Sequence, residues 1–490
     1  MQQPDLQSIK APSKTALSLA LSDGSNLFCE EFVRVIPNKR LVCSGIRHQT
    51  PVYAKIFIGK KNQFYAARDE AGVKILQLAN FATPSLLCAT EIVGVQGRVL
   101  VFEAIKNAQN TEQVWLKLNP NQRLSLAKKL VQEIAKHHNA GLLQTDLYLK
   151  NFLLDDEKIY TLDGDSIRQY AKLSEQQALK NLSVLLSKFD VLEVEIWLAD
   201  LLKTYAEARN WEAVPEVNLI KKMTNAHRQK VASNYADKKV FRQCTDVNVH
   251  ATEGIYIAAA SDASNISLPS NLQTLDSLFN VQNLLKNGNT CTVALAEISG
   301  EKIVIKRYNI KSVWHGLGRA LRQTRAAVSW ANAHRLKILD IATAKPIALI
   351  EQRNFGLKGK AYFLAEYIDA PDAAQFFAEC ADKTARAEAV INSVTLFYKL
   401  YLLKISHGDM KATNIKIIDN QPVLIDLDSM RQHATYFRSS LAHLRDLNRF
   451  MQNWQNEPAL YNAFVETFNV VYPDISILIK AGIATNKELA

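Results

Sequence analysis

The chain has 490 residues, a hydrophobic fraction of 48% and a formal net charge of +11 at pH 7. This length allows more than one domain, and the hydrophobic fraction is ordinary for a globular protein. The six cysteines lie far apart without a Cys-x-x-Cys pair. Their spacing argues against a disulfide framework or a cysteine-rich metal centre and favours a reducing cytoplasm.

The N-terminal residues 1–14 have no apolar core of the signal-peptide type, and no run approaches the roughly 20 apolar residues that cross a bilayer. We therefore expect a soluble or peripheral protein. The positive charge favours a polyanionic partner, such as a nucleotide, a phosphorylated glycan or an anionic lipid. Zinc-finger spacing and RNA-binding aromatic motifs are absent from the sequence, so we expect no nucleic-acid partner.

The first half begins with a strand-rich region and continues with helices. Alternating or continuous apolar residues predict strands, and apolar residues at helical spacing predict helices. In chain order these patterns predict strands at 32–36 and 52–57, a helix at 61–78, a strand at 98–103, a helix at 122–138 and a mostly helical stretch at 168–236.

A segment rich in Ser, Asn, Asp and Ala separates the two halves. We place a linker at 251–276, between a first domain at 1–250 and a second at 277–490. The strand-rich beginning then recurs. The second half is predicted to contain strands at 292–298, 303–306 and 362–366 and helices at 316–339 and 384–403. The whole pattern predicts an α+β fold.

One polar pattern occurs in both halves. In the first half Asp146 is followed by Asn151 and, after a predicted hairpin, by Asp163. The second half repeats these three residues at a constant offset of 263, as Asp409, Asn414 and Asp426. An Asp, an Asn and an Asp at this spacing form a phosphoryl-transfer site, and two copies indicate an internal repeat.

These residue types suit the transfer of a phosphoryl group from ATP with Mg²⁺ as cofactor, in which catalysis is positioning plus charge neutralisation. We expect Asp146 and Asp409 to accept the proton of the acceptor hydroxyl. Mg²⁺ prefers hard oxygen ligands, and the hairpin would bring the other members of each pattern together. The predicted metal ligands are Asn151, Asp163, Asn414 and Asp426.

A lysine in a central strand of each half is predicted to hold the phosphates of the nucleotide. Lys55 and Lys306 end apolar runs close to the pattern Val-Ala-Ile-Lys, and a lysine in such a strand needs a negative partner. In the first half, Glu70 is placed to orient Lys55. The second half has no Asp or Glu from 302 to 339, where Asn332 is the nearest polar candidate.

Two glutamates and two glycine-poor segments are further candidates at the nucleotide. Glu103 and Glu366, which also differ by 263, are predicted cofactor-binding residues at the ends of strands. The phosphate loop is poor in glycine, with Ser44-Gly45 in the first half and residues 287–290 in the second. A hairpin turn is an equal interpretation of both segments.

The residues around Asp409 include two more candidates for the catalytic set. His407 is expected to orient the loop that carries Asp409, and Gln144 replaces it in the first half. Lys411 is placed to contact the transferring phosphate, where the first half has Tyr148.

The segment 302–337 is strongly basic. Two interpretations stay open: a solvated helix face, or a docking surface for a phosphorylated glycan or an anionic membrane. Its nine basic residues are Lys302, Lys306, Arg307, Lys311, Arg319, Arg322, Arg325, Arg335 and Lys337.

The motifs at Asp146 and Asp409 resemble those of the lipopolysaccharide core kinases, the Kdo/WaaP family. The resemblance extends over about 30–240 and 280–455, and the segment from Arg445 to Trp454 resembles the C-terminal helix of the family. It implies two tandem bilobal protein-kinase-like domains. Each would have a small antiparallel-sheet N-lobe and a compact, mainly helical C-lobe.

The resemblance further implies an ATP-dependent kinase that phosphorylates heptose or Kdo of the lipopolysaccharide inner core, or a lipid-linked glycan, at the cytoplasmic face of the inner membrane. No Ala-Pro-Glu segment follows Asp426, which favours a small or glycan acceptor. Two alternatives stay open. One is a tandem pseudokinase that binds nucleotide and acts as a regulatory scaffold, and the other, suggested by Lys411, is a Ser/Thr protein kinase.

Overall fold

The computed structural model describes residues 5–156, 158–269, 272–288, 290–308, 323–354 and 357–483. The chain divides into two compact units, 1–228 and 229–490. The division falls inside helix α6 (Val217–Asp237), earlier in the chain than the predicted linker at 251–276. Both units combine antiparallel sheets with helices, in agreement with the predicted α+β class.

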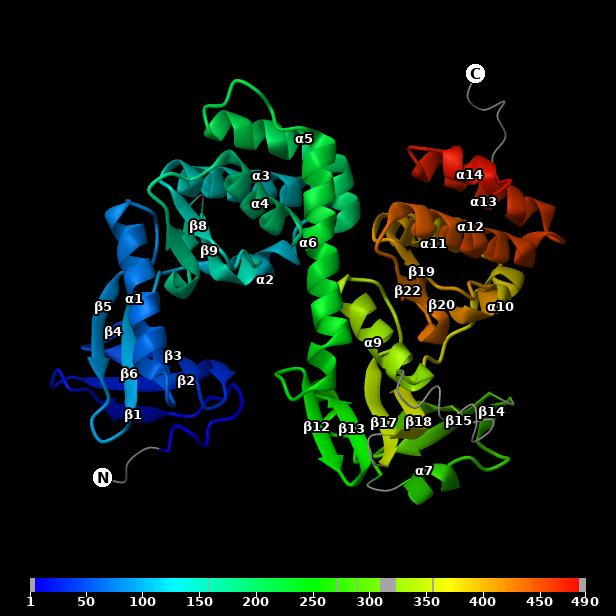
Figure 1. The fold of residues 1–490 in the computed structure, drawn as a ribbon, viewed down its shortest axis with the longest axis horizontal. Helices are drawn as coiled ribbons and strands as arrows, with labels where there is room; N and C mark the ends of the chain where they lie inside the picture. The colour runs from blue at the N-terminus through cyan, green and yellow to red at the C-terminus, as the bar shows by residue number, and fades with distance from the viewer. Residues whose placement is uncertain are drawn as a thin grey trace. The chain divides into compact units, whose positions relative to one another are not determined.

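The first unit begins with a six-stranded sheet of order β1-β2-β3-β4-β6-β5 (Figure 1). Its strands are β1 (Leu17–Ala20), β2 (Asn26–Ile36), β3 (Arg40–Arg47), β4 (Thr50–Ile58), β5 (Leu86–Glu91) and β6 (Gly97–Glu103). Helix α1 (Asn62–Leu78) packs on the sheet, and its Ala66 and Val73 join Phe57 and Leu100 in one buried cluster. The sheet therefore fixes how α1 faces β4.

The rest of the first unit is mainly helical. Its helices before α6 are α2 (Thr111–Trp115), α3 (Pro120–Asn139), α4 (Glu175–Leu186) and α5 (Val191–Ala208). Helix α3 begins where Asn119 and Gln122 form a capping box and Pro120 takes the first helical position. Short elements beside these helices carry the polar pattern: β7 (Gln109–Asn110), β8 (Leu142–Gln144), η1 (Leu149–Asn151), β9 (Phe152–Asp155), β10 (Lys158–Thr161), η2 (Gly164–Ser166) and β11 (Ile167–Gln169).

The second unit contains a seven-stranded sheet of order β12-β13-β17-β18-β16-β15-β14. Its strands are β12 (Val247–Thr252), β13 (Gly254–Ala260), β14 (Leu284–Asn287), β15 (Cys291–Ile298), β16 (Glu301–Tyr308), β17 (Pro346–Asn354) and β18 (Leu357–Glu366). The short 3-10 turns η3 (Lys239–Phe241) and η4 (Ser261–Ala263) flank the β12–β13 hairpin, and α7 (Leu272–Ser277) precedes β14. Helix α9 (Arg325–Ile338) packs on β17 and β18.

The helical part of the second unit packs around buried aromatic rings, among them Phe377, Phe450, Trp454 and Phe464. Its helices are α10 (Ala373–Glu379), α11 (Lys383–Leu402), α12 (Tyr436–Met451), α13 (Pro458–Val471) and α14 (Ser476–Lys480). Its short elements are β19 (Ile405–Ser406), η5 (Ala412–Asn414), β20 (Ile415–Ile418), β21 (Gln421–Leu424), η6 (Leu427–Ser429), β22 (Arg431–Gln432) and η7 (Gln452–Trp454).

The two large sheets share a set of five neighbouring strands. The order β2-β3-β4-β6-β5 in the first unit is matched by β14-β15-β16-β18-β17 in the second. The registers also agree, because Lys55 pairs with Leu100 while Lys306 pairs with Phe363. The first unit adds β1 at one edge of this set, and the second adds the β12–β13 hairpin at the opposite edge.

The long elements agree with the sequence-based expectations, and the sheet edges do not. The predicted helices at 61–78, 122–138 and 384–403 correspond to α1, α3 and α11. Strand β13 lies inside the predicted linker, because its composition resembles a connection while its pairing with β17 makes it part of the sheet. The predicted helix at 316–339 is observed from Arg325, and its residues 316–322 lie outside the described residues.

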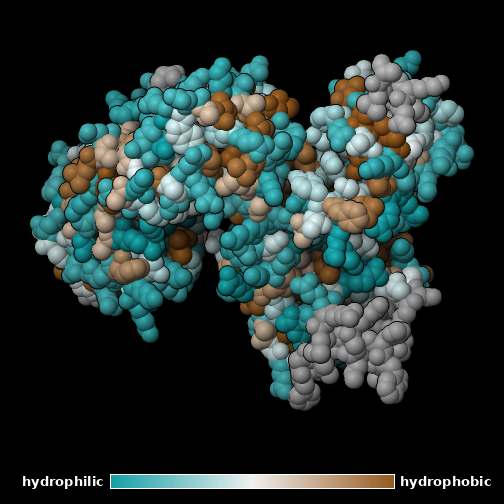
Figure 2. Space-filling model, turned by 45° about the horizontal axis from the view of Figure 1, so that its top comes forward, coloured by the Kyte–Doolittle hydropathy of each residue, from teal (hydrophilic) through white to brown (hydrophobic). Residues whose placement is uncertain are grey.

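Among the residues that the structure describes, no helix is both long enough and apolar enough to cross a bilayer. The face of the molecule in Figure 2 carries hydrophobic residues in small separate groups among hydrophilic ones.

Candidate active site

In the second unit, the chain brings Asp409, Asn414 and Asp426 together through local structure. The side-chain amide of Asn414 donates to the main-chain oxygen of Asp409 at 2.8 Å and to its Oδ2 at 3.2 Å. The β20–β21 hairpin then folds back, and the N–H of Ile425 donates to the main-chain oxygen of Asn414 at 3.0 Å. Asp426 therefore follows directly beside Asn414, as the spacing predicts.

Asp426 has the left-handed backbone conformation, with φ of 63°. This conformation is uncommon outside glycine, and such strain concentrates at functional sites. The ammonium of Lys306 lies 2.9 Å from Asp426 Oδ1. Burial by itself would raise the pKa of Asp426, but the charge and hydrogen bond of Lys306, together with the charges of His407 and Lys286, outweigh burial and the pKa is lowered. Asp426 is therefore ionised and ready to bind a cation.

Lys411 and His407 differ in what they contact. The ammonium of Lys411 lies 3.3 Å from Asp409 Oδ2, and both side chains are partly exposed. His407 is fully buried, and its Nε2 lies 2.9 Å from the main-chain oxygen of Ile425, the residue before Asp426. His407 therefore positions the strand that leads into Asp426, while Lys411 contacts Asp409 from a partly exposed position.

The first unit repeats this local geometry. Asn151 donates to the main-chain oxygen of Asp146 at 2.8 Å and to its Oδ2 at 3.2 Å. The N–H of Leu162 donates to the main-chain oxygen of Asn151 at 2.9 Å, and Asp163 has φ of 66°. Gln144 takes the place of His407, because its side-chain amide donates to the main-chain oxygen of Leu162.

The partner of Lys55 corrects one of the predicted residues. Lys55 donates to the two carboxylate oxygens of Asp69 at 2.7 and 3.0 Å and lies 3.4 Å from Asp163 Oδ1. Glu70, which the sequence suggested for this role, instead binds Lys74 and Arg98. Successive residues on a helix point about 100° apart, so only one of the two acids can face β4.

In the second unit, helix α9 offers Asn332 and no acid at this place. The buried side-chain amide of Asn332 donates to the main-chain oxygens of Leu427 and Met430, both at 2.9 Å. Asn332 thus holds the turn after Asp426, and Lys306 has Asp426 as its carboxylate partner.

Three residues that the sequence reasoning missed stand at the first-unit site. Arg40 lies 3.6 Å from Asp163 Oδ1. Lys188 lies 3.7 Å from the ring centroid of Tyr148, and its pKa is lowered to about 8 by burial, against the opposing charge of Asp146. The third is Asp69, one residue before the predicted Glu70. The direction in which each side chain points from the helix could have distinguished Asp69 from Glu70. No local sequence pattern identifies Arg40 or Lys188 as site residues.

Each unit has another acid two residues after the last Asp of the repeated pattern, Asp165 after Asp163 and Asp428 after Asp426, and an arginine pairs with it. Arg68 forms a two-pronged ion pair with Asp165, and Arg325 pairs with Asp428 at 2.6 Å. Asp165 and Asp428 are therefore each engaged by an arginine, whereas Asp163 and Asp426 face the sheet lysine of their own unit.

Glu103 and Glu366 occupy equivalent exposed positions at the ends of β6 and β18. Glu103 pairs with Val52, three residues before Lys55, and Glu366 pairs with Ile303, three residues before Lys306. The structure therefore places each of them in the same sheet as the lysine of its own unit.

The predicted phosphate loops lie differently in the two units. Ser44-Gly45 is inside β3, where a Cβ on Gly45 would meet the main-chain oxygen of Phe28, so glycine serves close strand packing there. The hairpin turn that connects β2 to β3 is residues 37–39 instead. In the second unit, residues 288–290 do connect β14 to β15, and Asn289 lies outside the described residues.

The basic segment 302–337 is largely paired where it is described. Lys311, Arg319 and Arg322 lie outside the described residues. The other six each have an acidic partner: Lys302 with Asp369, Lys306 with Asp426, Arg307 with Asp276, Arg325 with Asp428, Arg335 with Asp237 and Lys337 with Asp262. The described part therefore favours a network of ion pairs over a docking surface.

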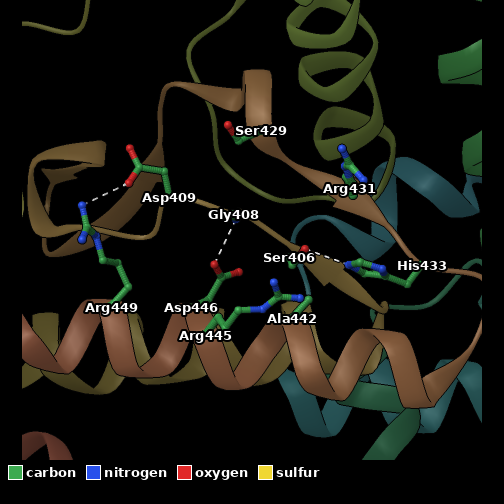
Figure 3. A pocket seen from close by; sticks show the side chains of 10 residues that line it. All are labelled: Ser406, Gly408, Asp409, Ser429, Arg431, His433, Ala442, Arg445, Asp446 and Arg449. Atoms are coloured by element: carbon green, nitrogen blue, oxygen red, sulfur yellow. Dashed lines mark hydrogen bonds and ion pairs between the residues drawn. The ribbon is translucent and has the colours of Figure 1, made fainter.

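A pocket of about 530 Å³ opens beside Asp409 (Figure 3). Three arginines line it from β22 and α12, namely Arg431, Arg445 and Arg449. Asp409 and Asp446 are its two acids, and Arg449 lies 3.6 Å from Asp409 Oδ1. Asp446 is buried and accepts main-chain N–H groups, so the pocket presents an excess of positive charge at its surface.

The donor set of the second unit suits Mg²⁺ that is shared with phosphates. Among the described residues, no group of three or more His, Cys, Asp and Glu could hold a metal ion by itself. Asp426 supplies a carboxylate, and Asn414 uses its amide nitrogen on Asp409, which leaves its amide oxygen as the available ligand. Mg²⁺ is commonly bound in this way, by one or two protein oxygens together with substrate phosphates.

Comparison with known proteins places this site within a kinase family match. Residues 281–471 match the model of the lipopolysaccharide kinase (Kdo/WaaP) family. A similar protein is the 3-deoxy-D-manno-octulosonic acid kinase of Vibrio parahaemolyticus, which is 39% identical over 71 residues, or 14% of this chain. The chain spans about 29% of the length of that relative. Both names are those of kinases, and the family match includes Asp409, Asn414 and Asp426.

Proposed function

We propose that the chain is an ATP-dependent phosphotransferase whose second unit phosphorylates a heptose or Kdo sugar of the lipopolysaccharide inner core. One observation carries the proposal. Asp409, Asn414 and Asp426 converge beside Lys306, inside the segment that matches the lipopolysaccharide kinase family. A chain with this activity would meet its acceptor at the cytoplasmic face of the inner membrane as a peripheral protein.

In this proposal each residue acts on one part of the reaction. Lys306 holds the phosphates of ATP, and Asn414 and Asp426 hold Mg²⁺ by their oxygens. Bound Mg²⁺ neutralises phosphate charge. Asp409 accepts the proton of the sugar hydroxyl. The hydroxyl oxygen then bonds to the γ-phosphorus of ATP, and the bond from that phosphorus to the departing ADP oxygen breaks. Lys411 stabilises the charge on the transferring group.

The basic pocket supports an anionic acceptor. Arg431 and Arg445 line the same pocket as Asp409, and the carboxylates in that lining are those of Asp409 and Asp446. Guanidinium groups bind carboxylates and phosphates in a two-pronged geometry. A carboxylate or phosphate on the acceptor sugar would be held there, with a neighbouring hydroxyl directed at Asp409.

We propose the same bilobal, protein-kinase-like organisation for both units. The shared strand order and the repeated contacts at Asp146 and Asp409 support it. In the first unit the corresponding set is Lys55, Asp146, Asn151 and Asp163, with Glu103 at the end of the neighbouring strand. Glu366 has that place in the second unit.

The test is phosphate transfer by the purified full chain to lipopolysaccharide inner-core acceptors that carry Kdo alone or Kdo and heptose. We expect Asp409→Asn to abolish transfer from radiolabelled ATP. A matched control is Asp419→Asn, the same change in the exposed turn of the β20–β21 hairpin. Full activity of Asp409→Asn, or equal loss in both variants, would refute the proposal.

A further inference from the structure

In the first unit, two positively charged side chains lie close to the same carboxylate oxygen of Asp163. Lys55 lies 3.4 Å and Arg40 lies 3.6 Å from Asp163 Oδ1. The same guanidinium lies 3.9 Å from Asp69 Oδ2, and Asp69 is fully buried. We call these four residues the Asp163 cluster. Its two cations balance its two acids before any ligand binds.

Arg40 is held in this position by the sheet. It is the first residue of β3 and pairs with Phe57 of β4, whose ring centroid lies 5.9 Å from the guanidinium carbon. The side chain of Arg40 is 15% exposed. Its Nε is buried and makes no hydrogen bond among the described residues, so the guanidinium has donor capacity left for a ligand.

A second arginine adds positive charge beside the cluster. Arg34 stands on β2, opposite Val42, which in turn pairs with Lys55. Partial desolvation lowers the pKa of Arg34, the charge of Arg40 adds to this effect, and Asp163 and Asp146 oppose it. Arg34 therefore interacts with Asp163 of the cluster and with Asp146.

The second unit differs at one equivalent position. Lys286 of β14 pairs with Val293, which pairs with Lys306, so Lys286 corresponds to Arg34. Cys291, the first residue of β15, pairs with Tyr308, two residues after Lys306. By this register Cys291 takes the place of Arg40. Asp426 therefore faces Lys306 without an arginine at that position.

A guanidinium and a divalent cation can each neutralise the phosphate charge of a nucleotide beside this carboxylate. Mg²⁺ needs oxygen ligands at about 2.0–2.1 Å in near-octahedral geometry, and a cation fixed beside the carboxylate repels it. A guanidinium stays charged at physiological pH and donates several hydrogen bonds to phosphate oxygens. The predicted Mg²⁺ ligands Asn151 and Asp163 therefore do not fit a divalent cation as well as their counterparts Asn414 and Asp426.

We propose that the first unit binds the phosphate chain of a nucleoside triphosphate without a divalent cation, with Arg40 in the place that the cation takes in the second unit. This proposal takes one thing from the proposed function, namely that the ligand of the site is a nucleotide. It gives the first unit a binding site that does not depend on phosphate transfer.

The experiment measures binding of a fluorescent ATP analogue to the full chain in EDTA and in Mg²⁺. Lys306→Met is present in every measurement on the first unit, to remove the site of the second unit. In this background we expect binding in EDTA, and Arg40→Cys should weaken it by about 10- to 100-fold, the range for a lost hydrogen bond to a charged group. Lys39→Cys, in the exposed hairpin turn, is the matched control and should bind as before.

Two further variants separate a loss of binding from a loss of folding. Arg40→Lys keeps the charge and should retain part of the binding in EDTA. Cys291→Arg, in a chain that keeps Lys306 and carries Lys55→Met to remove the site of the first unit, should weaken the Mg²⁺ dependence of nucleotide binding by the second unit. Binding to the Lys306→Met chain only in Mg²⁺, binding unaffected by Arg40→Cys, or no binding at all would each overturn the proposal. None of these results depends on whether the second unit transfers phosphate.

Discussion

The carboxylate of Asp446 on α12 accepts the main-chain N–H of His407 at 2.6 Å, and its other oxygen accepts the N–H of Gly408 at 2.9 Å. Burial raises the pKa of Asp446, and the two N–H donors oppose this effect. The buried carboxylate of Asp446 therefore holds the loop before Asp409, while His407 holds the strand that leads to Asp426.

Asp446→Asn should disturb this loop. An amide has one acceptor oxygen, so one of the two N–H groups would face another donor, and the expected loss of stability is about 1–3 kcal/mol. Urea unfolding measures the loss, and the rate of phosphate transfer should fall with it. Asp419→Asn serves as the control. A variant with unchanged stability and rate would show that Asp446 does not support the loop.

Asp409→Asn and Asp146→Asn should differ in their effect. If the second unit carries the reaction, removal of the base Asp409 should lower kcat by about 10²- to 10⁴-fold, the usual contribution of a positioned base. Asp146→Asn should leave kcat within a factor of about two, a difference too small to indicate a lost base. Steady-state kinetics with one acceptor measures both, and the opposite order of effects would assign the reaction to the first unit.

Arg445→Ala should weaken acceptor binding. The loss of one guanidinium from the pocket beside Asp409 should raise KM for the acceptor by about tenfold and leave KM for ATP unchanged, because an ion-paired hydrogen bond is lost on one substrate alone. Arg438→Ala, an exposed arginine on α12 that is absent from the pocket lining, is the control. A rise in KM for ATP instead would place Arg445 at the nucleotide.

Asp69→Asn and Glu70→Gln should separate two neighbouring acids. Asp69 is the carboxylate bonded to Lys55, so its neutral variant should weaken nucleotide binding by the first unit about tenfold, in the Lys306→Met background. Glu70→Gln should not, because Glu70 binds Lys74 and Arg98. Equal effects of the two changes would contradict the assignment of Asp69.

The stability of the second unit should decrease in mild acid. Burial lowers the pKa of His443 from 6.5 to about 3. Below pH 6.5 the unfolded chain takes up a proton at this histidine and the folded chain does not, so stability falls as the pH decreases toward 3. The slope is about 1.4 kcal/mol per pH unit for one such group.

Urea midpoints between pH 7 and pH 5 check this dependence. His443→Gln should reduce the slope, to which buried His334 contributes in the same direction, and His250→Gln, at an exposed histidine on β12, should leave it unchanged. An equal slope in all three proteins would mean that His443 contributes nothing to the acid sensitivity.

Most of the helices and the Asp–Asn–Asp geometry could be predicted, whereas the sheet edges could not. Helices α1, α3 and α11 follow from apolar spacing within one segment. Strand β13 has the composition of a connection, and its pairing with β17 depends on residues almost a hundred positions away. Local pattern carries no information about such a partner, so the sequence predicts a linker where the sheet has β13.

The repeated Asp–Asn–Asp set follows from local sequence, because each Asn lies five residues after its Asp and a short hairpin returns the chain to the second Asp. The contacts of Asp69 with Lys55 and of Arg40 with Asp163 do not follow from local sequence and are seen in the folded chain. Both contacts depend on the rotation of α1 over the sheet and on the register of β3 against β4, and packing between segments sets these.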